Sequence, residues 1–100
     1  MSLESMTAEL VRRASQNAPL GYKVKFVLGD DGIIYWDGTE TTAKVTNEDA
    51  EADTVIHLSA DDFAKLMGGA LDPTMAFMLG KLKVEGKLGV AMKLSTLLGD

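Results

Sequence analysis

The chain has 100 residues, 46% of them hydrophobic and 25% charged, a balance typical of one small globular domain, so we expect a single domain over residues 1–100. A net charge of −5 argues against nucleic-acid binding, and the absence of cysteine excludes disulfides, thiolate metal sites and cysteine nucleophiles. We therefore expect a reducing, cytoplasmic location, and no apolar run reaches the roughly 18 residues that would span a membrane.

The amino-terminal part predicts a helix followed by a pair of strands. Ser2 is suited to cap a helix that runs to about Asn17, because apolar residues recur there at three- and four-residue spacing. Residues 22–28 alternate apolar side chains with lysines, which predicts a half-buried strand. A hairpin turn over 29–32 leads into a β-branched and aromatic strand over 33–36.

The middle of the chain predicts two more strands separated by an acidic loop. A weaker strand is expected over 41–46, a solvated loop over 47–53 and a further strand over 54–58. His57, the only histidine, falls inside that last strand. Zinc would need further nitrogen or sulfur ligands at short spacing, so we expect a structural or surface histidine and no metal site.

Two helices are predicted next. Ser59 followed three residues later by Asp62 fits a capping pattern, with an apolar stripe behind it. Asp72 and Pro73 then begin a short helix, because an acid before a proline is typical of a helix start. We expect this helix to end at Gly80 and to turn three residues inward: Met75, Met78 and Leu79.

The carboxyl-terminal part predicts a fifth strand and a last helix. Residues 81–85 alternate with Leu82 and Val84 inward, and residues 87–98 form a helix that is apolar on more than one side. This order of elements predicts an α+β fold, with a mixed, largely antiparallel sheet and helices covering one face.

Motifs for catalysis or nucleotide binding are lacking in the sequence. There is no G-x-S-x-G elbow, and the segment 80–88 has five residues between its glycines where a phosphate loop has four. The Asp-Gly turns lack the twelve-residue pattern of a calcium loop. We therefore expect no cofactor and no catalytic residues, and an enzyme is the third alternative.

Apolar residues concentrate in the last third of the chain, where four of the six methionines lie. Methionine adapts to ligands of variable shape, so this part could line a cavity, although an ordinary core is the competing interpretation. Five consecutive apolar residues over 75–79 favour the cavity, because they cannot all face one side of a helix. The candidates are Phe63, Met67, Leu71, Met75, Phe77, Met78, Met92, Leu97 and Leu98.

The combination of segments 52–63, 68–75 and 77–88 resembles the sterol carrier protein 2 family. The alternating strand, the acid-capped helix, the Asp-Pro helix and the G-x-L-x-V-x-G stretch follow in the order and spacing of that family. The resemblance implies a five-stranded sheet covered by helices, a hydrophobic tunnel for fatty acyl chains, sterols or similar lipids, and no catalytic residues. Trp36 and Leu82 complete the expected tunnel lining.

We therefore expect noncovalent binding, and transfer, of an apolar small-molecule lipid by a protein that is a monomer or a homodimer. Lys81, Lys83 and Lys87 could meet an anionic head group or touch a membrane transiently, although solvated strand positions explain them equally well. The alternative function is an accessory or oligomerisation module that contributes a lid or a dimer face without lipid transport.

Overall fold

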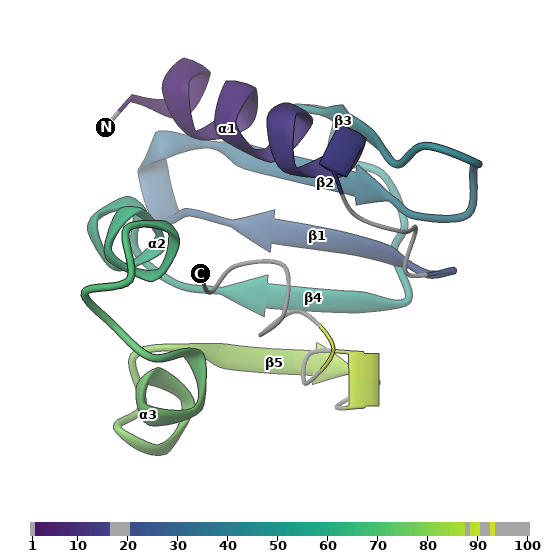
Figure 1. Ribbon diagram of the computed structural model, residues 1–100. Helices are drawn as coiled ribbons and strands as arrows, with labels where there is room; N and C mark the ends of the chain where they lie inside the picture. The colour runs from purple at the N-terminus through teal and green to yellow at the C-terminus, as the bar shows by residue number, and fades with distance from the viewer. Residues whose placement is uncertain (1, 17–20, 88, 91–92, 94–100) are drawn as a thin grey trace.

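Five strands form one sheet in the order β3-β2-β1-β4-β5 (Figure 1). In the computed structural model, which describes residues 2–16, 21–87, 89–90 and 93, β1 (Lys23–Val27) is the central strand. It pairs antiparallel with β2 (Ile33–Asp37) and parallel with β4 (Thr54–His57). The two edge strands also pair antiparallel: β3 (Lys44–Thr46) with β2, and β5 (Lys83–Gly86) with β4. The mixed, largely antiparallel sheet predicted from the sequence is confirmed.

Helices cover one face of this sheet. Figure 1 shows α1 (Leu3–Gln16) lying across β2 and β3, and α2 (Ala60–Met67) at one end of β1 and β4. The short α3 (Pro73–Met78) lies beside β5. Among the described residues, no helix has the length and apolar character needed to cross a membrane. The α+β fold with a helix-covered face is therefore confirmed.

The predicted helix caps are present. The backbone N–H of Ser5 donates to Ser2 Oγ at 3.1 Å, and that of Asp62 donates to Ser59 Oγ at 3.0 Å. Asp72 Oδ1 accepts from the backbone N–H of Thr74 at 2.7 Å, with proline at the first helical position. Each cap satisfies a backbone donor that has no partner within its helix, so the local sequence determines where the helices begin.

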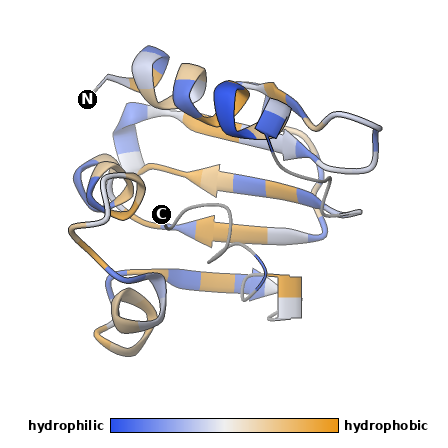
Figure 2. Ribbon diagram, in the orientation of Figure 1, coloured by the Kyte–Doolittle hydropathy of each residue, from blue (hydrophilic) through white to orange (hydrophobic). Residues whose placement is uncertain are grey.

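Alternating side chains place the core between the sheet and the helices. Figure 2 shows hydrophobic and hydrophilic residues alternating along β1 and β5. The helix-facing residues of β1, β2 and β4 are fully buried, and they form one cluster with the apolar stripes of α1 and α2. The cluster therefore runs along most of the sheet and makes one continuous interior.

Several predicted boundaries differ from the structure. The turn at 29–32 contains a one-turn 3₁₀ helix, η1 (Gly29–Asp31), and the third strand begins at Lys44 because Thr41 and Thr42 lie exposed in a bend. The fifth strand is Lys83–Gly86, displaced by up to two residues from the prediction. Of the last predicted helix, residues 89, 90 and 93 are helical and Lys87 is not, and residues 88, 91, 92 and 94–98 lie outside the described residues.

The acidic loop 47–53 is attached to the outer face of the sheet. It joins an edge strand to β4 on the far side of β1, so it must cross β2 and β1. Lys25 Nζ lies 2.8 Å from Asp49 Oδ1, and the Tyr35 hydroxyl donates to the carbonyl oxygen of Glu51. All four acids of the loop are exposed, as expected of a solvated loop, and the crossover topology also brings the loop against the sheet.

Candidate functional site

The helix-covered face of the sheet carries two rows of mostly apolar side chains. The strand register sets neighbouring residues side by side across the sheet. In the second row, the ring of Phe26 lies 5.1 Å from that of Phe63 on α2, tilted by 49°. This is a favoured aromatic geometry, so the α2 end of the interior is closely packed. The rows are Val45, Trp36, Val24 and Thr54, and Ile34, Phe26, Ile56 and Val84.

Polar groups inside this interior are few. Arg13 and Thr54 are the buried polar or charged residues in the described part of the chain. Arg13 Nη2 donates to the carbonyl oxygen of Met67 at 2.7 Å, and Thr54 Oγ1 donates to that of Lys87 at 3.1 Å. Both side chains therefore have structural partners, and the cluster around them consists of hydrophobic residues.

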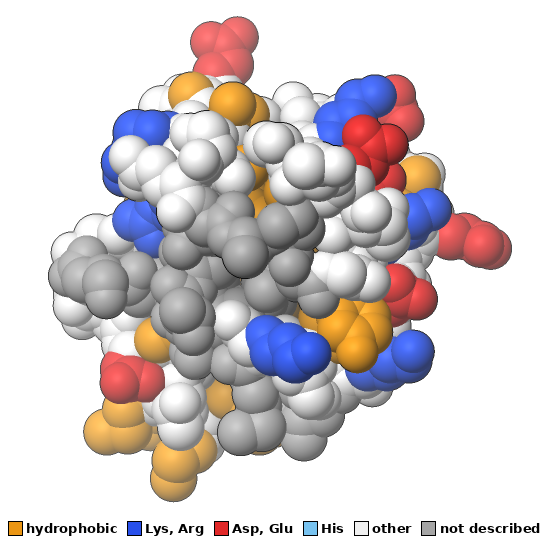
Figure 3. Space-filling model, turned by 45° about the vertical axis from the view of Figure 1, so that its right-hand side comes forward, with side chains coloured by type: hydrophobic (Ala, Val, Ile, Leu, Met, Phe, Trp, Pro, Cys, Tyr) orange, Lys and Arg blue, Asp and Glu red, His pale blue; other side chains and the backbone are white. Residues whose placement is uncertain are grey.

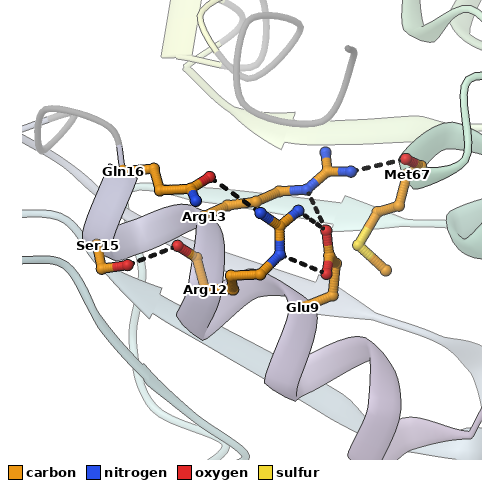
Figure 4. Close-up of polar contacts among 6 residues, drawn as sticks. All are labelled: Glu9, Arg12, Arg13, Ser15, Gln16 and Met67. Carbon is orange, nitrogen blue, oxygen red and sulfur yellow. Dashed lines mark hydrogen bonds and ion pairs between the residues drawn. The ribbon is translucent and has the colours of Figure 1, made fainter.

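An ionic cluster holds α1 against the end of α2 (Figure 4). The guanidinium groups of Arg12 and Arg13 both bond the Glu9 carboxylate, Arg13 through Nε at 3.0 Å. These hydrogen bonds lower the pKa of the Glu9 carboxyl from 4.5 to about 2. Arg13 then reaches Met67 on the other helix, so one side chain links the two helices that cover the interior.

The predicted lining residues fall into three groups. Four of them belong to the buried cluster, and Leu71 is half-buried against it. Three more, Met75, Phe77 and Met78, lie on the surface. Met92, Leu97 and Leu98 fall outside the described residues. The structure thus brings together Trp36, Phe63, Met67 and Leu82.

The prediction that Met75, Met78 and Leu79 face inward was wrong. Their exposed fractions are 54%, 74% and 63%, and that of Phe77 is 45%. Ala76 is the buried residue of α3. A six-residue helix has fewer than two turns, so it presents about one position to the sheet, and a small side chain permits close approach. Figure 3 shows hydrophobic side chains protruding at this end of the molecule.

The sequence-based set of lining residues omitted most of the buried cluster. The helical spacing in α1 and the alternation in β1 had indicated buried faces there, yet the predicted lining came almost entirely from the methionine-rich last third of the chain. They belong to the same buried cluster as the predicted residues. The omitted residues include Met6, Leu10, Val24, Phe26, Ile34, Ile56 and Leu66.

His57 lies on the outer face of the sheet, away from this interior. Its Nε2 is 2.6 Å from Glu85 Oε2 on the neighbouring strand, and both side chains are well exposed. The described residues contain no group of histidine, cysteine, aspartate or glutamate side chains that could hold a metal ion. The histidine is thus a surface residue whose ring is hydrogen-bonded to a carboxylate on the next strand.

Comparison with known proteins shows one family. The model of the SCP-2 sterol transfer family matches residues 8–99. Hydroxysteroid dehydrogenase-like protein 2 of Mus musculus is 37% identical over 97 residues, which cover 95% of this chain and 19% of that protein. The chain spans about a fifth or less of the length of the relatives that it matches.

Solved structures show the same fold. The sterol carrier protein domain 2 of Helicoverpa armigera superposes with a TM-score of 0.75 at 26% identity, covering 95% of this chain and 83% of that one. A palmitated sterol carrier protein 2-like protein of Aedes aegypti has a TM-score of 0.75 at 19% identity, covering 100% and 96% of the two chains.

Proposed function

The chain belongs to the SCP-2 sterol transfer family, and from this premise we propose that it binds an apolar lipid noncovalently between the sheet and its helices. The observation that carries the proposal is the apolar character of the interior between the sheet and its helices, where the buried Arg13 and Thr54 side chains are already bonded to backbone carbonyls. Burial of alkyl carbon in such surroundings contributes about 0.8 kcal/mol per methylene. Affinity therefore arises without a polar cage.

The cargo class that we propose is a long-chain fatty acyl group or a sterol. The structural neighbours include a palmitated protein and a sterol carrier domain, which supports both chemistries. The interior contains two aromatic rings in contact and flexible methionines, Met6 and Met67. Such side chains adapt to ligands of different outline, which favours a class of lipids over one compound.

We further propose that the chain carries its ligand without altering it chemically. Acid–base catalysis needs a polar side chain within reach of the substrate, and the buried Arg13 and Thr54 are engaged in structural hydrogen bonds. The dehydrogenase-like name of the relatives belongs to proteins of which this chain matches about a fifth. The carrier function that we propose for this chain does not require dehydrogenase activity.

Transfer requires contact with a membrane, and we propose that the α3 end makes it. Four exposed apolar residues project there: Met75, Phe77, Met78 and Leu79. The exposed Lys81 follows them after Gly80, and its backbone N–H donates to the carbonyl oxygen of Ala76 on α3 at 2.9 Å. Apolar side chains beside a cation suit a bilayer surface that contains anionic lipid. We name this group, with Lys81, the α3 patch.

Binding of a fluorescent fatty acid to delipidated protein tests the carrier proposal. Saturable enhancement of the probe's emission is expected, together with its displacement by palmitate or cholesterol. Native mass spectrometry of the same sample should show one lipid per chain. Emission that rises linearly with probe concentration, with no displacement and no lipid-bound mass, would show that the interior is an ordinary core.

A further inference from the structure

One donor inside the apolar interior has no acceptor. Trp36 is 1% exposed, and its Nε1 is the one buried side-chain polar atom without a hydrogen-bond partner in the part of the chain that the structure describes. Folded proteins bond nearly all of their buried polar groups, because an unbonded one destabilises the fold. An orphaned N–H in a candidate binding interior therefore points to an acceptor that comes from outside the protein.

Among the described residues, the strand neighbours of Trp36 carry no side-chain acceptor for its indole N–H. Its neighbours in the sheet register are Val24 on β1 and Val45 on β3, both apolar. The hydroxyl of the same row belongs to Thr54, which lies two strands away and donates to the Lys87 carbonyl at 3.1 Å. The indole N–H is thus a polar group flanked on both neighbouring strands by apolar side chains.

We propose that Trp36 Nε1 donates a hydrogen bond to an oxygen of the bound lipid. An indole N–H is a donor only, so a hydroxyl, carbonyl or carboxylate oxygen satisfies it and a hydrocarbon does not. The preferred ligand is then an apolar chain or ring system with one oxygen acceptor that reaches β2. This inference rests on the proposed lipid-binding function and specifies where the polar end of the cargo lies.

A cycle of two proteins and two ligands measures this hydrogen bond. Decanol and undecane share a chain and differ by a hydroxyl in place of a methyl group, and their affinities follow from displacement of an apolar fluorescent probe. Trp36→Phe removes the N–H and keeps an aromatic ring. We expect the ratio of decanol to undecane affinity to fall about tenfold in this variant, the size of one hydrogen bond.

The ratio separates the hydrogen bond from changes in packing. General loosening of the interior should change the affinities for decanol and undecane by the same factor, so it leaves their ratio unchanged. Phe63→Leu is the matched control, because Phe63 is a fully buried aromatic residue of the same cluster with no polar atom in its side chain. Its decanol-to-undecane ratio should equal that of the wild type.

A measurement on the unaltered protein avoids any dependence on how the variant folds. Trp36 is the only tryptophan, so the protein has one indole N–H resonance in its nuclear magnetic resonance spectrum. Decanol should move this proton downfield as a hydrogen bond forms, and undecane should not.

Two outcomes overturn the proposal in different ways. Equal ratios in wild type and Trp36→Phe, with the same indole shift for both ligands, would exclude the hydrogen bond and leave lipid carriage intact. Absence of saturable binding for either ligand, and for palmitate and cholesterol, would contradict the carrier function and the role of Trp36 together.

Discussion

Arg13 and Met67, separated by 54 positions in the chain, are joined by a hydrogen bond of 2.7 Å from the guanidinium Nη2 to the backbone carbonyl oxygen. Met67 is the last residue of α2, and its carbonyl is one that has no acceptor role within the helix. The bond therefore satisfies a helix end and holds α1 and α2 together above the sheet. Through this bond, the two helices that cover the interior are joined to each other.

Replacing Arg13 should loosen that cover. Arg13→Met keeps much of the apolar stem but leaves the Met67 carbonyl unbonded in a buried place, which should lower the free energy of unfolding by about 2 kcal/mol. Arg12→Met is the control, because the Arg12 side chain is 54% exposed and solvent screens its ion pair, so this variant should lose little stability. Urea denaturation of both variants measures the difference, and equal losses would contradict the structural role of Arg13.

The Glu9 carboxylate makes stability depend on pH in the acid range. Its pKa in the folded protein is about 2, below the ordinary value of 4.5, because Arg12 and Arg13 bond the charged form. The stabilisation is complete above pH 4.5 and is lost as the pH falls through 2. In thermal unfolding measured from pH 5 to 2, the Glu9→Gln variant should therefore lose less stability as the pH falls than the wild type does. Parallel curves for the two proteins would show that another carboxylate is responsible.

Most of the fold could be predicted from local patterns. Alternation of apolar residues predicted strands over 22–28 and 54–58, and the structure has them at Lys23–Val27 and Thr54–His57. The third strand was overextended, because two threonines with β propensity lie in a bend beyond the last pairing with β2. Whether a residue joins a strand depends on the partners that the neighbouring strand provides, and the β propensity of the residue alone does not describe those partners.

The candidate site was predictable in part. Phe63 and Met67 were identified because helical spacing places both on one face of α2 with Leu66, and all three are buried. Met75 and Met78 were misplaced because composition shows how much apolar surface a segment has, not which side of a short helix meets the sheet. The unbonded Trp36 N–H had no sequence signal, because it depends on valines brought alongside by two other strands.

Gly86 should tolerate no side chain, in contrast to Gly80 at the other end of the same glycine-bounded segment. Both have positive φ, +96° and +76°, which L residues rarely adopt. A Cβ on Gly86 would lie 2.4 Å from the carbonyl oxygen of Asp53, whereas one on Gly80 would meet nothing within 4 Å. Gly80→Ala should therefore cost about 1 kcal/mol of backbone strain, and Gly86→Ala roughly 1–3 kcal/mol more.

Denaturant titration of these two alanine variants provides the measurement. Since Gly86 pairs with Thr54 across β4 and β5, the excess loss should come with weaker protection of the β5 amides in hydrogen exchange. Equal losses for the two variants would mean that the β4–β5 register relaxes to accept the methyl group.

A charge on the α3 patch should weaken membrane contact without unfolding the protein. Met78 is the most exposed apolar residue of the patch, so Met78→Asp should change the free energy of unfolding by less than about 0.5 kcal/mol. Inserting one methionine into a bilayer surface contributes about 1.5–3 kcal/mol, so affinity for vesicles with phosphatidylglycerol should fall at least about tenfold. Vesicle co-sedimentation measures it.

Val11→Asp distinguishes the α3 patch from general loss of surface hydrophobicity. Val11 is an apolar residue on α1 with an exposed fraction of 50%, close to that of the patch residues, yet it lies outside the α3 patch. Its variant should bind the anionic vesicles as the wild type does, and wild type should bind neutral vesicles less well because Lys81 then lacks a charged partner. If both aspartate variants lose vesicle binding equally, α3 is not the contact. If Met78→Asp instead converts a dimer to a monomer in light scattering and leaves vesicle binding unchanged, the patch joins two copies of the chain.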